Sequence, residues 1–528
     1  MPHASPKALA LSIGEGEMPA NTTPNQQIEH LVLLARVTFS YNHSMDIFSA
    51  PLPFSLILFG ASGHLARIKL FPALYVLALK KRLPKEYAIV GFSRTEMETT
   101  AFRMFVEKAV REHMLEVNES VLGEFLSHVY YCTGQYTNLA SFSSLKEQLL
   151  QIEKGWKNQV RLAYYSVPPN LFSSIAHNLC ESGIRSETSP VRSIVEKPVG
   201  HDRESFEEIR EKFLSCSREE DLYLLDHYLG KEAVRNIFYL RYANPIVERI
   251  FKNTLIHHVE ITAFEEKGLE GRAGYFEHTG TLRDMFQSHL LMIGSLLTMR
   301  LTEKDESVVH NRAKALEQFY LPSTAKLGEI VLQGQYTAGT VHGESVLGYR
   351  EEEGISATSR TNTFACLKLM TRSSRWDGVP FYLRSGKRLA KKETRISIVF
   401  QEPHPIGKGA EPNRLEFILQ GEAGMRITLQ TKLGGTVPAF RPLILTDPLV
   451  CVGDCLPEHS LLLLEAIHGK RQWFLTFEEV RCAWRLMDPL QAYLSAPDTP
   501  LYTYPAGSRG PEEADAWIER DSIAWISS

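Results

Sequence analysis

The first organised stretch of the chain is an apolar run of strand length, Phe54–Phe59, which ends at Gly60. Its composition is typical of a buried strand. After the glycines, apolar residues recur at helical spacing from Leu65 to Ala78, and residues 87–92 form a second apolar run. A strand, a helix and a strand in this order make two parallel strands joined by a crossover helix. The pattern therefore predicts that the folded part begins with an α/β domain.

The alternation of apolar runs and amphipathic stretches continues to about residue 200. It predicts helices over residues 102–116 and 139–152 and strands over residues 128–132, 161–167 and 193–196. A doubly wound, Rossmann-like parallel sheet accounts for all of these elements.

Beyond about residue 235, apolar and polar residues alternate with a period of two, which is typical of half-buried antiparallel strands. The expected strands span residues 256–264, 364–371, 395–400, 415–420 and 425–431, and the expected helices span residues 282–301 and 457–467. We therefore predict a second, larger α+β domain with a mostly antiparallel sheet.

Length and charge narrow the class of protein. The 528 residues exceed three times the ~150 that serve as a soft unit of domain counting, so at least two domains are expected. Lys and Arg number 58 and Asp and Glu number 62, and this balance predicts no nucleic-acid partner and no binding to anionic membranes. No apolar run approaches the roughly 20 residues of a spanning helix, and no secretory signal is recognisable, so we expect a cytoplasmic protein.

Seven cysteines are few for this length and odd in number, which favours a reducing compartment over a disulfide framework. Cys451, Cys455 and His459 are spaced four apart, as metal ligands can be. Because no second cluster completes such a site, we treat them as ordinary residues and predict no metal.

A glycine turn separates the first strand from the first helix. Gly60, Ser62, Gly63, His64 and Leu65 form a pattern in which backbone N–H groups can approach a pyrophosphate at the positive end of a helix. This favours dinucleotide binding, with a plain tight turn as the alternative.

Arg94 bears on which dinucleotide binds. An NAD site usually has a carboxylate at the end of the second strand to hold the ribose 2'-hydroxyl, whereas this chain has Arg94. A guanidinium suits a 2'-phosphate, which favours NADP, and a solvated surface arginine is the alternative.

A second cluster lies downstream. Residues 226–231 place an acid, an imidazole, a phenol, a glycine and an ammonium directly after an apolar run. Such groups suit an anionic, hydroxylated ligand, although a polar junction whose groups pair with each other has the same composition.

The chain closely resembles the glucose-6-phosphate dehydrogenase family from about residue 54 to residue 515. The motifs that carry the resemblance are GASGHLA at 60–66, EKPVG at 196–200, DHYLGKE at 226–232, EGRAGYF at 270–276, RDMFQSHL at 283–290, WDGVPF at 376–381, SGK at 385–387 and GSRGP at 507–511. The resemblance implies a nucleotide-binding domain joined to a β+α domain, and usually a homodimer or homotetramer. We accordingly expect a poorly ordered extension over residues 1–50, an NADP-binding domain over 51–226 and a substrate-binding and oligomerisation domain over 227–528.

The resemblance also implies roles for individual residues. His289 matches the general base and Asp226 the carboxylate that orients it, while Lys197, followed by a cis-proline at Pro198, lies between substrate and coenzyme. The implied ligands of the substrate are His227, Tyr228, Lys231 and Lys392 at the phosphate and Glu265, Asp284 and Lys387 at the sugar, with Lys69 at the mouth of the site. The chemistry agrees, because oxidation of a hemiacetal at C1 needs a base near neutral pH and local cations for the phosphate. As a lone residue on an apolar helix, His289 would more often be a buried histidine with satisfied hydrogen bonds.

Three positions depart from the family pattern: His64 stands where aspartate is nearly always found, Ala273 where glycine is usual and Met292 where glutamine is frequent. The substitution at His64 bears on coenzyme affinity. The implied activity is NADP-dependent oxidation of D-glucose 6-phosphate to 6-phosphoglucono-lactone, which opens the oxidative pentose phosphate route. The alternatives are the same chemistry on another sugar phosphate or with NAD, and a catalytically silent homologue that senses NADP or sugar phosphate. The sequence leaves open whether a second, structural NADP binds.

Overall fold

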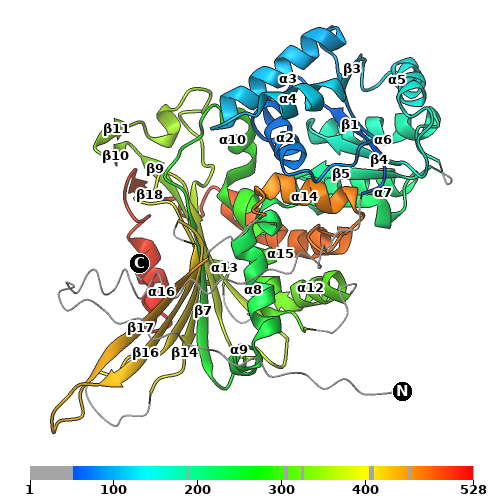
Figure 1. Ribbon diagram of the computed structural model, residues 1–528. Coiled ribbons are helices and arrows are strands. Elements are labelled where there is room, and N and C mark those ends of the chain that lie inside the picture. The colour runs from blue at the N-terminus through cyan, green and yellow to red at the C-terminus, as the bar shows by residue number, and fades with distance from the viewer. Residues whose placement is uncertain are drawn as a thin grey trace, which may run out of the picture. The chain divides into compact units, whose positions relative to one another are not determined.

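Two sheets organise the part of the chain that the structure describes (Figure 1). A computed structural model describes residues 51–526 apart from 187–188, 302–306, 323–325, 404–408, 422 and 450–453. The predicted extension over residues 1–50 and Cys451 lie outside the described residues.

The first sheet has six strands among the described residues, all pairs parallel, in the order β3-β2-β1-β4-β5-β6. The strands are β1 (Phe54–Phe59), β2 (Tyr87–Ser93), β3 (Val129–Thr133), β4 (Val160–Tyr165), β5 (Val191–Glu196) and β6 (Leu222–Leu225). The predicted doubly wound sheet is confirmed. Its order reverses between β1 and β4, and ligands of such sheets bind at the carboxyl ends of strands at this switch point.

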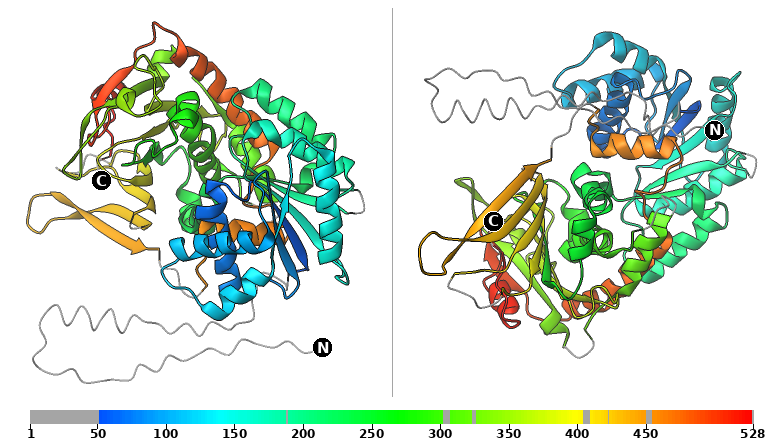
Figure 2. Two further views of the ribbon diagram at one scale, coloured as in Figure 1. Left: turned by 90° about the horizontal axis from the view of Figure 1, so that it is seen from above. Right: turned by 60° about the horizontal axis from the view of Figure 1, so that its bottom comes forward.

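Helices cover both faces of this sheet (Figures 1 and 2). One group packs around α2 (Phe71–Leu79), which follows a π-helical turn η1 (Ala66–Leu70), and the other around α6 (Phe172–Glu181). The remaining elements of this region are α3 (Thr99–His113), α4 (Glu119–Ser127), α5 (Leu139–Ile152), η2 (Pro169–Leu171), α7 (Arg203–Leu214) and η3 (Glu219–Asp221). The helix predicted over residues 102–116 spans residues 99–113 instead. Its start was missed because its polar first turn carries no apolar periodicity.

The second sheet is larger and mixed. Among the described residues its strands follow the order β17-β16-β15-β14-β7-β13-β12-β9-β18, and β8 pairs with β12. The strands are β7 (Ile256–Phe264), β8 (Phe319–Tyr320), β9 (Val331–Thr337), β12 (Phe364–Thr371), β13 (Phe381–Gly386), β14 (Glu393–Phe400), β15 (Arg414–Gln420), β16 (Gly424–Lys432), β17 (Phe440–Pro448) and β18 (Tyr502–Pro505). Most pairs are antiparallel as predicted, but β13 runs parallel to β7 and β18 parallel to β9.

Helical elements contact one face of this sheet, with η5 (Leu282–Leu290) against β7 and β13 and α8 (Glu232–Ala243) against β15. The stretch predicted as one helix over residues 282–301 is a π-helical segment, η5, followed by α11 (Leu291–Thr298). Further elements are η4 (His227–Gly230), α9 (Pro245–Ile250), α10 (Ala273–Thr281), α12 (Ser307–Gln318), α13 (Leu327–Ile330), β10 (Gly339–Val341), β11 (Glu344–Val346), η6 (Tyr349–Glu351), α14 (Glu458–Ile467), α15 (Phe477–Ser495) and α16 (Glu513–Glu519).

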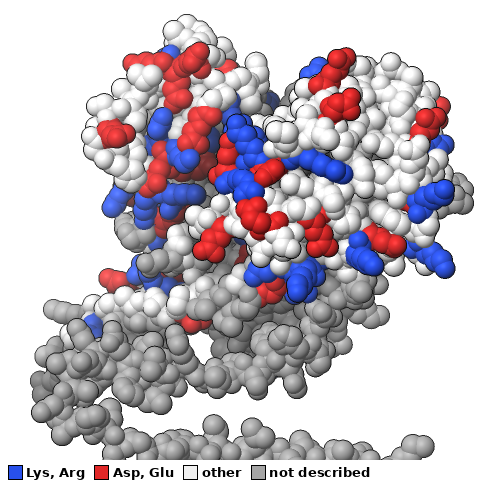
Figure 3. All heavy atoms as spheres, turned by 45° about the horizontal axis from the view of Figure 1, so that its top comes forward, with Lys and Arg blue, Asp and Glu red and all other residues white. Residues whose placement is uncertain are grey.

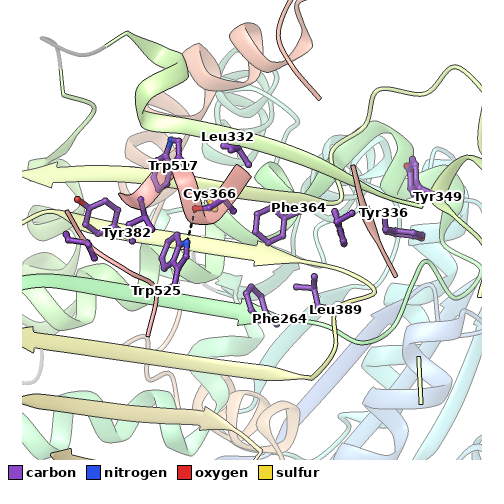
Figure 4. Close-up of a cluster of buried hydrophobic side chains, with 14 of the residues drawn as sticks. Phe264, Leu332, Tyr336, Tyr349, Phe364, Cys366, Tyr382, Leu389, Trp517 and Trp525 are labelled. Carbon is purple, nitrogen blue, oxygen red and sulfur yellow. Dashed lines mark hydrogen bonds between the residues drawn. The ribbon is translucent and has the colours of Figure 1, made fainter. Parts of the chain in front are cut away.

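An aromatic cluster packs against another part of the second sheet (Figure 4). Phe264, Phe364 and Tyr382 from three strands meet Trp517 and Trp525 from the C-terminal segment. The indole rings of Trp517 and Trp525 are stacked, with centroids 6.3 Å apart. The end of the chain is therefore part of the core of this domain.

Cysteine pairing differs from expectation. Cys180 and Cys216 form a disulfide, with Cα atoms 6.4 Å apart, although the cysteine count favoured free thiols. The packing of α6 against α7 brings together residues that are 36 positions apart, a contact that counting cannot reveal.

Charges of both signs are interspersed on the face drawn in Figure 3, in keeping with the net charge of -4. Among the described residues, no helix is both long enough and apolar enough to cross a bilayer.

Candidate functional site

The glycine turn lies at the carboxyl end of β1, at the switch point of the parallel sheet. Gly60 has φ +81°, and a Cβ there would lie 2.1 Å from the carbonyl oxygen of Ser166. A Cβ on Gly63 would lie 2.9 Å from the carbonyl oxygen of Gly60. Only glycine fits both positions, so the backbone stays open to a ligand. His64 is exposed and Leu65 half-buried where the chain enters η1. This cradle fits the pyrophosphate of a dinucleotide.

Arg94 is exposed directly after β2, the strand beside β1. Its guanidinium lies 5.9 Å from the ring centroid of Tyr136. The Ser62 hydroxyl lies 3.0 Å from that of Ser93 and 3.2 Å from that of Thr95. The turn and the end of β2 thus form one polar edge with an exposed cation at its side.

Asp226 and His289 form a buried pair at the end of β6. Asp226 accepts a hydrogen bond from the Tyr228 amide at 2.9 Å, and its Oδ1 lies 2.5 Å from Nδ1 of His289. The two residues are 0% and 1% exposed. The Tyr228 ring stacks on the imidazole, with centroids 4.0 Å apart.

The electrostatics of this pair favour a base. Burial lowers the pKa of His289, and the nearby Lys197 lowers it further. Burial opposes ionisation of Asp226, but His289 outweighs this and the pKa of Asp226 lies below its ordinary value. The pair therefore holds a neutral imidazole whose Nδ1–H donates to a carboxylate, which leaves the Nε2 lone pair as the acceptor.

Lys197 connects this pair with its neighbours. It follows β5, and its peptide bond to Pro198 is cis, as the resemblance implied. Its Nζ lies 2.6 Å from Nε2 of His289, 2.9 Å from the carbonyl oxygen of Asp284 and 3.3 Å from the Ser288 hydroxyl. A cation therefore lies at the nitrogen that would accept a proton.

Opposite charges continue along the site. Asp284 on η5 lies 3.7 Å from Lys197 and 4.0 Å from Lys387, and Lys387 also pairs with Glu265. Burial works against the charge on Asp284, yet the two lysines hold the pKa of its carboxyl below the ordinary value. The π-helical geometry of η5 presents Asp284, Ser288 and His289 to Lys197, and such segments are frequent at functional sites.

Cations gather on the other side of Tyr228. Lys231 Nζ lies 3.7 Å from the centroid of that ring, and burial lowers the pKa of Lys231 to about 8. Lys392 is exposed and close enough to lower that pKa further. His227 has a pKa well below its ordinary value, first through burial and then through His289.

Several residues near the site were not foreseen. Thr394 lies 3.5 Å from the Tyr228 hydroxyl and donates to the side-chain oxygen of Gln420 at 3.0 Å. Gln420 ends a predicted strand and Thr394 directly precedes another, and a single polar residue at such a position carries no distinguishing signal. Glu458 lies 3.8 Å from Lys69, and the imidazole of His459, whose Nδ1 lies 3.7 Å from the carboxylate, lowers the pKa of Glu458 to about 2. His459, considered above as a metal ligand, instead stacks near His227, with centroids 6.5 Å apart.

Asp226, His227 and His289 offer ligand atoms within 4.8 Å of one another, a spacing that a metal ion can use. The hydrogen bond between Asp226 and His289 already satisfies two of these groups, and the Lys197 ammonium beside His289 would repel a cation. The donor set therefore favours proton transfer over metal binding.

The predicted residues thus fall into two groups. The glycine turn and Arg94 form the first group, and the residues around His289 form the second. Lys197 belongs to the second group, although it directly follows a strand of the parallel sheet. Family models match both domains of the chain. The family model for the glucose-6-phosphate dehydrogenase NAD binding domain matches residues 57–236, and the model for the C-terminal domain of the same family matches residues 238–526.

Relatives match over most of their length. Glucose-6-phosphate 1-dehydrogenase of Chlamydia pneumoniae is 36% identical over 493 residues, which cover 90% of this chain and 96% of the relative. The Bacillus subtilis enzyme of the same name is 32% identical over 89% of this chain and 97% of its own. A solved structure of glucose-6-phosphate dehydrogenase in complex with its substrate glucose-6-phosphate superposes with a TM-score of 0.83 at 29% identity, covering 91% of this chain and 100% of that one. The chain therefore belongs to the glucose-6-phosphate dehydrogenase family.

Proposed function

We propose that this protein oxidises D-glucose 6-phosphate at C1 to 6-phospho-D-glucono-1,5-lactone, with hydride transfer to NADP. The hydrogen-bonded pair of Asp226 and His289 carries this proposal, because it is a buried base of suitable pKa among cations that suit a phosphorylated sugar. The reaction supplies NADPH through the oxidative pentose phosphate route.

In the proposed mechanism, Nε2 of His289 takes the proton of the C1 hydroxyl while the hydride of C1 leaves. NADP, when bound, accepts that hydride. Asp226 holds the imidazole in the required tautomer and stabilises the imidazolium that forms. Lys197 donates to Nε2 in the free protein, so it must exchange this contact for the substrate before the proton can move.

We assign the substrate contacts by charge. His227, Tyr228, Lys231 and Lys392 would bind the phosphate, since the two lysines supply positive charge beside the phenol. Glu265, Asp284 and Lys387 would bind the sugar hydroxyls, because their paired charges can both accept and donate. Lys197 would contact substrate and coenzyme.

We assign the coenzyme site to the cradle at Gly60, Ser62, Gly63, His64 and Leu65, with Arg94 on the 2'-phosphate of NADP. Arg94 supports NADP because a cation, not a carboxylate, follows β2. His64 exposes an imidazole at the same turn, where a ring N–H can donate to a pyrophosphate.

One experiment separates this activity from its alternatives. Nicotinamide reduction is followed with NADP and with NAD, each with glucose 6-phosphate, other sugar phosphates and glucose. The proposal predicts the highest kcat/KM for glucose 6-phosphate with NADP. Preference for another sugar phosphate or for NAD would replace it by a related dehydrogenase, and tight binding without turnover would support a silent sensor.

We further propose that the protein is cytoplasmic and forms a homodimer or homotetramer, and that its domain boundary lies at residues 226/227. The edge strand β17 supports self-association. It leaves Leu443 and Leu445 39% and 52% exposed on one face, between Arg441 and Asp447. Arg441 and Asp447 lie the same number of positions from Ile444 along the strand. A two-fold axis at Ile444 would therefore place Arg441 of each copy beside Asp447 of the other copy.

A further inference from the structure

Ile526, the last residue that the structure describes, contacts three adjacent strands of the second sheet. The amide of Ile526 donates to both carboxylate oxygens of Glu260 on β7, each at 3.2 Å. Its carbonyl oxygen accepts from Arg395 on β14 at 2.7 Å and from Arg384 on β13 at 3.5 Å. One backbone unit thus connects β7, β13 and β14.

Trp525 fixes this backbone unit in place. Its indole N–H donates to the carbonyl oxygen of Ala514 at 3.0 Å (Figure 4). The guanidinium of Arg384 lies 4.1 Å from the centroid of the Trp525 ring. Both contacts orient the segment before Ile526, and a cation over an indole face is attracted to the ring.

Proposed substrate ligands lie at the ends of the same three strands. Glu265 directly follows β7, Lys387 directly follows β13 and Lys392 directly precedes β14. Side chains alternate between the faces of a strand. Arg395 therefore lies on the face opposite Thr394, which contacts Tyr228 and Gln420 in the site. Arg384 lies on β13, three residues before Lys387.

The contacts with Ile526 also offset a concentration of positive charge within the sheet. Arg384 and Arg395 both pair in register with Thr262 of β7, so two buried guanidinium groups occupy one row of the sheet. Glu393 and Glu416 pair with Arg395, at 3.2 and 3.1 Å. The carbonyl oxygen of Ile526 is an acceptor that the two arginines share, and its loss would leave buried donors unsatisfied.

We infer that Trp525 and Ile526 form a brace that sets the positions of Glu265, Lys387 and Lys392, so that the end of the chain tunes substrate affinity. Trp525 and Ile526 are positioning residues, since they act through β7, β13 and β14. The inference rests on the proposed function, because it concerns the substrate ligands named there.

The test compares full-length protein with a truncation that lacks residues 525–528 and with Ile526→Pro, which keeps the length but removes the N–H that Glu260 accepts. Asp521→Asn is the matched control, because Asp521 joins the same sheet at Lys368 and Tyr382, away from the proposed ligands. Each protein is assayed for KM of both substrates, for kcat, and for glucose 6-phosphate binding by calorimetry without coenzyme.

We expect the KM and dissociation constant for glucose 6-phosphate to rise about tenfold on truncation and about threefold in Ile526→Pro, since small displacements of positioned groups weaken binding strongly. The KM for NADP and kcat should stay within about twofold, and the control should match full-length protein. Unchanged glucose 6-phosphate affinity in Ile526→Pro would overturn the brace, as would equal rises in both KM values. Absence of glucose 6-phosphate binding to full-length protein would instead contradict the proposed function.

Discussion

The imidazole of His289 lies between a carboxylate and an ammonium. Nδ1 faces Asp226 at 2.5 Å and Nε2 faces Lys197 at 2.6 Å. Burial and Lys197 keep the imidazole neutral, and Asp226 is ready to stabilise the imidazolium once a proton arrives. At the scale of single residues, the site is thus prepared to accept a proton without a permanent charge on the base.

Through the proposed phosphate contact of Lys231, we expect substrate affinity to depend on pH. Its pKa of about 8 means that the ammonium is charged below pH 8 and is lost as the pH rises through that value. Between about pH 7 and 9 a sugar phosphate is a dianion, so the charge of the substrate itself does not change. We expect the KM for glucose 6-phosphate to rise between about pH 7 and 9 while the KM for NADP stays level.

The control for this dependence is Lys231→Ala. It should raise the KM for glucose 6-phosphate at neutral pH and remove most of its change with pH, while activity on unphosphorylated glucose falls far less. A pH profile identical to that of the unaltered protein would exclude Lys231 as the titrating group.

Arg94 is the residue on which coenzyme choice depends in this account. Arg94→Ala should raise the KM for NADP by an amount that corresponds to the loss of about 1.5–3 kcal/mol, the range of hydrogen bonds to charged groups. The KM for NAD, which lacks the 2'-phosphate, should change little. Equal increases for both coenzymes, measured by steady-state kinetics, would show that Arg94 supports the fold of the turn instead.

The sequence predicted the roles of individual residues only where a motif surrounded them. His289 alone is an ordinary buried histidine by pattern, and the residues around it identified its proposed role. The contacts of Thr394, Gln420 and His459 depend on which strands and helices meet, so no local pattern could predict them.

At the scale of elements, the proposed coenzyme-binding residues and the proposed catalytic and substrate-binding residues each lie in or beside a π-helical segment. η1 follows the glycine turn, and η5 carries Asp284, Ser288 and His289. Such segments shift side chains around the helix axis relative to an α-helix. Apolar spacing located both helices but could not reveal this local change of geometry.

The glycine turn can be tested by a substitution that adds one methyl group. Gly60→Ala should lower the free energy of unfolding by at least ~1 kcal/mol and raise the KM for NADP, because φ is +81° and the new Cβ would meet the Ser166 carbonyl. Chemical denaturation and steady-state kinetics would measure both effects.

Gly123→Ala is the matched control, since Gly123 lies within α4 and, apart from its own helix backbone, no described residue comes within 4 Å of an added Cβ. It should leave kinetics unchanged and stabilise the protein by about 0.5–1 kcal/mol. If the two variants behaved alike, the turn would not require glycine at position 60.

Element prediction succeeded where periodicity was strong. The strands Ile256–Phe264 and Phe364–Thr371 and the helix Leu139–Ile152 have the predicted bounds. The 19-residue helix α15 was missed because Pro489 lies inside it and prolines usually end helices. The strand β17 was missed because it is exposed on both faces and contains two prolines.

At the scale of the whole molecule, a parallel sheet that would hold the coenzyme is joined to a mixed sheet that would hold the substrate. The sequence predicted both sheets from the change of hydrophobic period near residue 235. It could not predict the parallel pairing of β7 with β13, because strand direction depends on contacts between distant segments.

The self-association proposed above can be tested through charge. The β16–β17 hairpin lies at the edge of the sheet (Figures 1 and 2), and Arg441 and Asp447 flank its exposed leucines. Arg441→Asp should raise the dimer dissociation constant at least about tenfold, because two like-charge contacts would replace two attractive ones. Light scattering across a concentration series would show the change in mass.

Combining Arg441→Asp with Asp447→Arg restores both opposite-charge contacts and should recover the dimer. An unchanged mass in the single variant, or failure of the double variant to recover, would place any self-association on another surface.

The central claim is that His289 is the base and that Asp226 acts through it, and a double-mutant comparison of turnover tests it most directly. His289→Asn should retain binding of both ligands but lower kcat by at least the ~10²–10⁴ typical of general base catalysis, and Asp226→Asn should lower it in the same direction. The two losses should not multiply in the double variant, because the residues act as one unit. The acidic limb of the pH profile, which lies below the ordinary histidine pKa of about 6.5, should disappear with His289. Near-normal turnover of His289→Asn with that acidic limb intact would contradict the account.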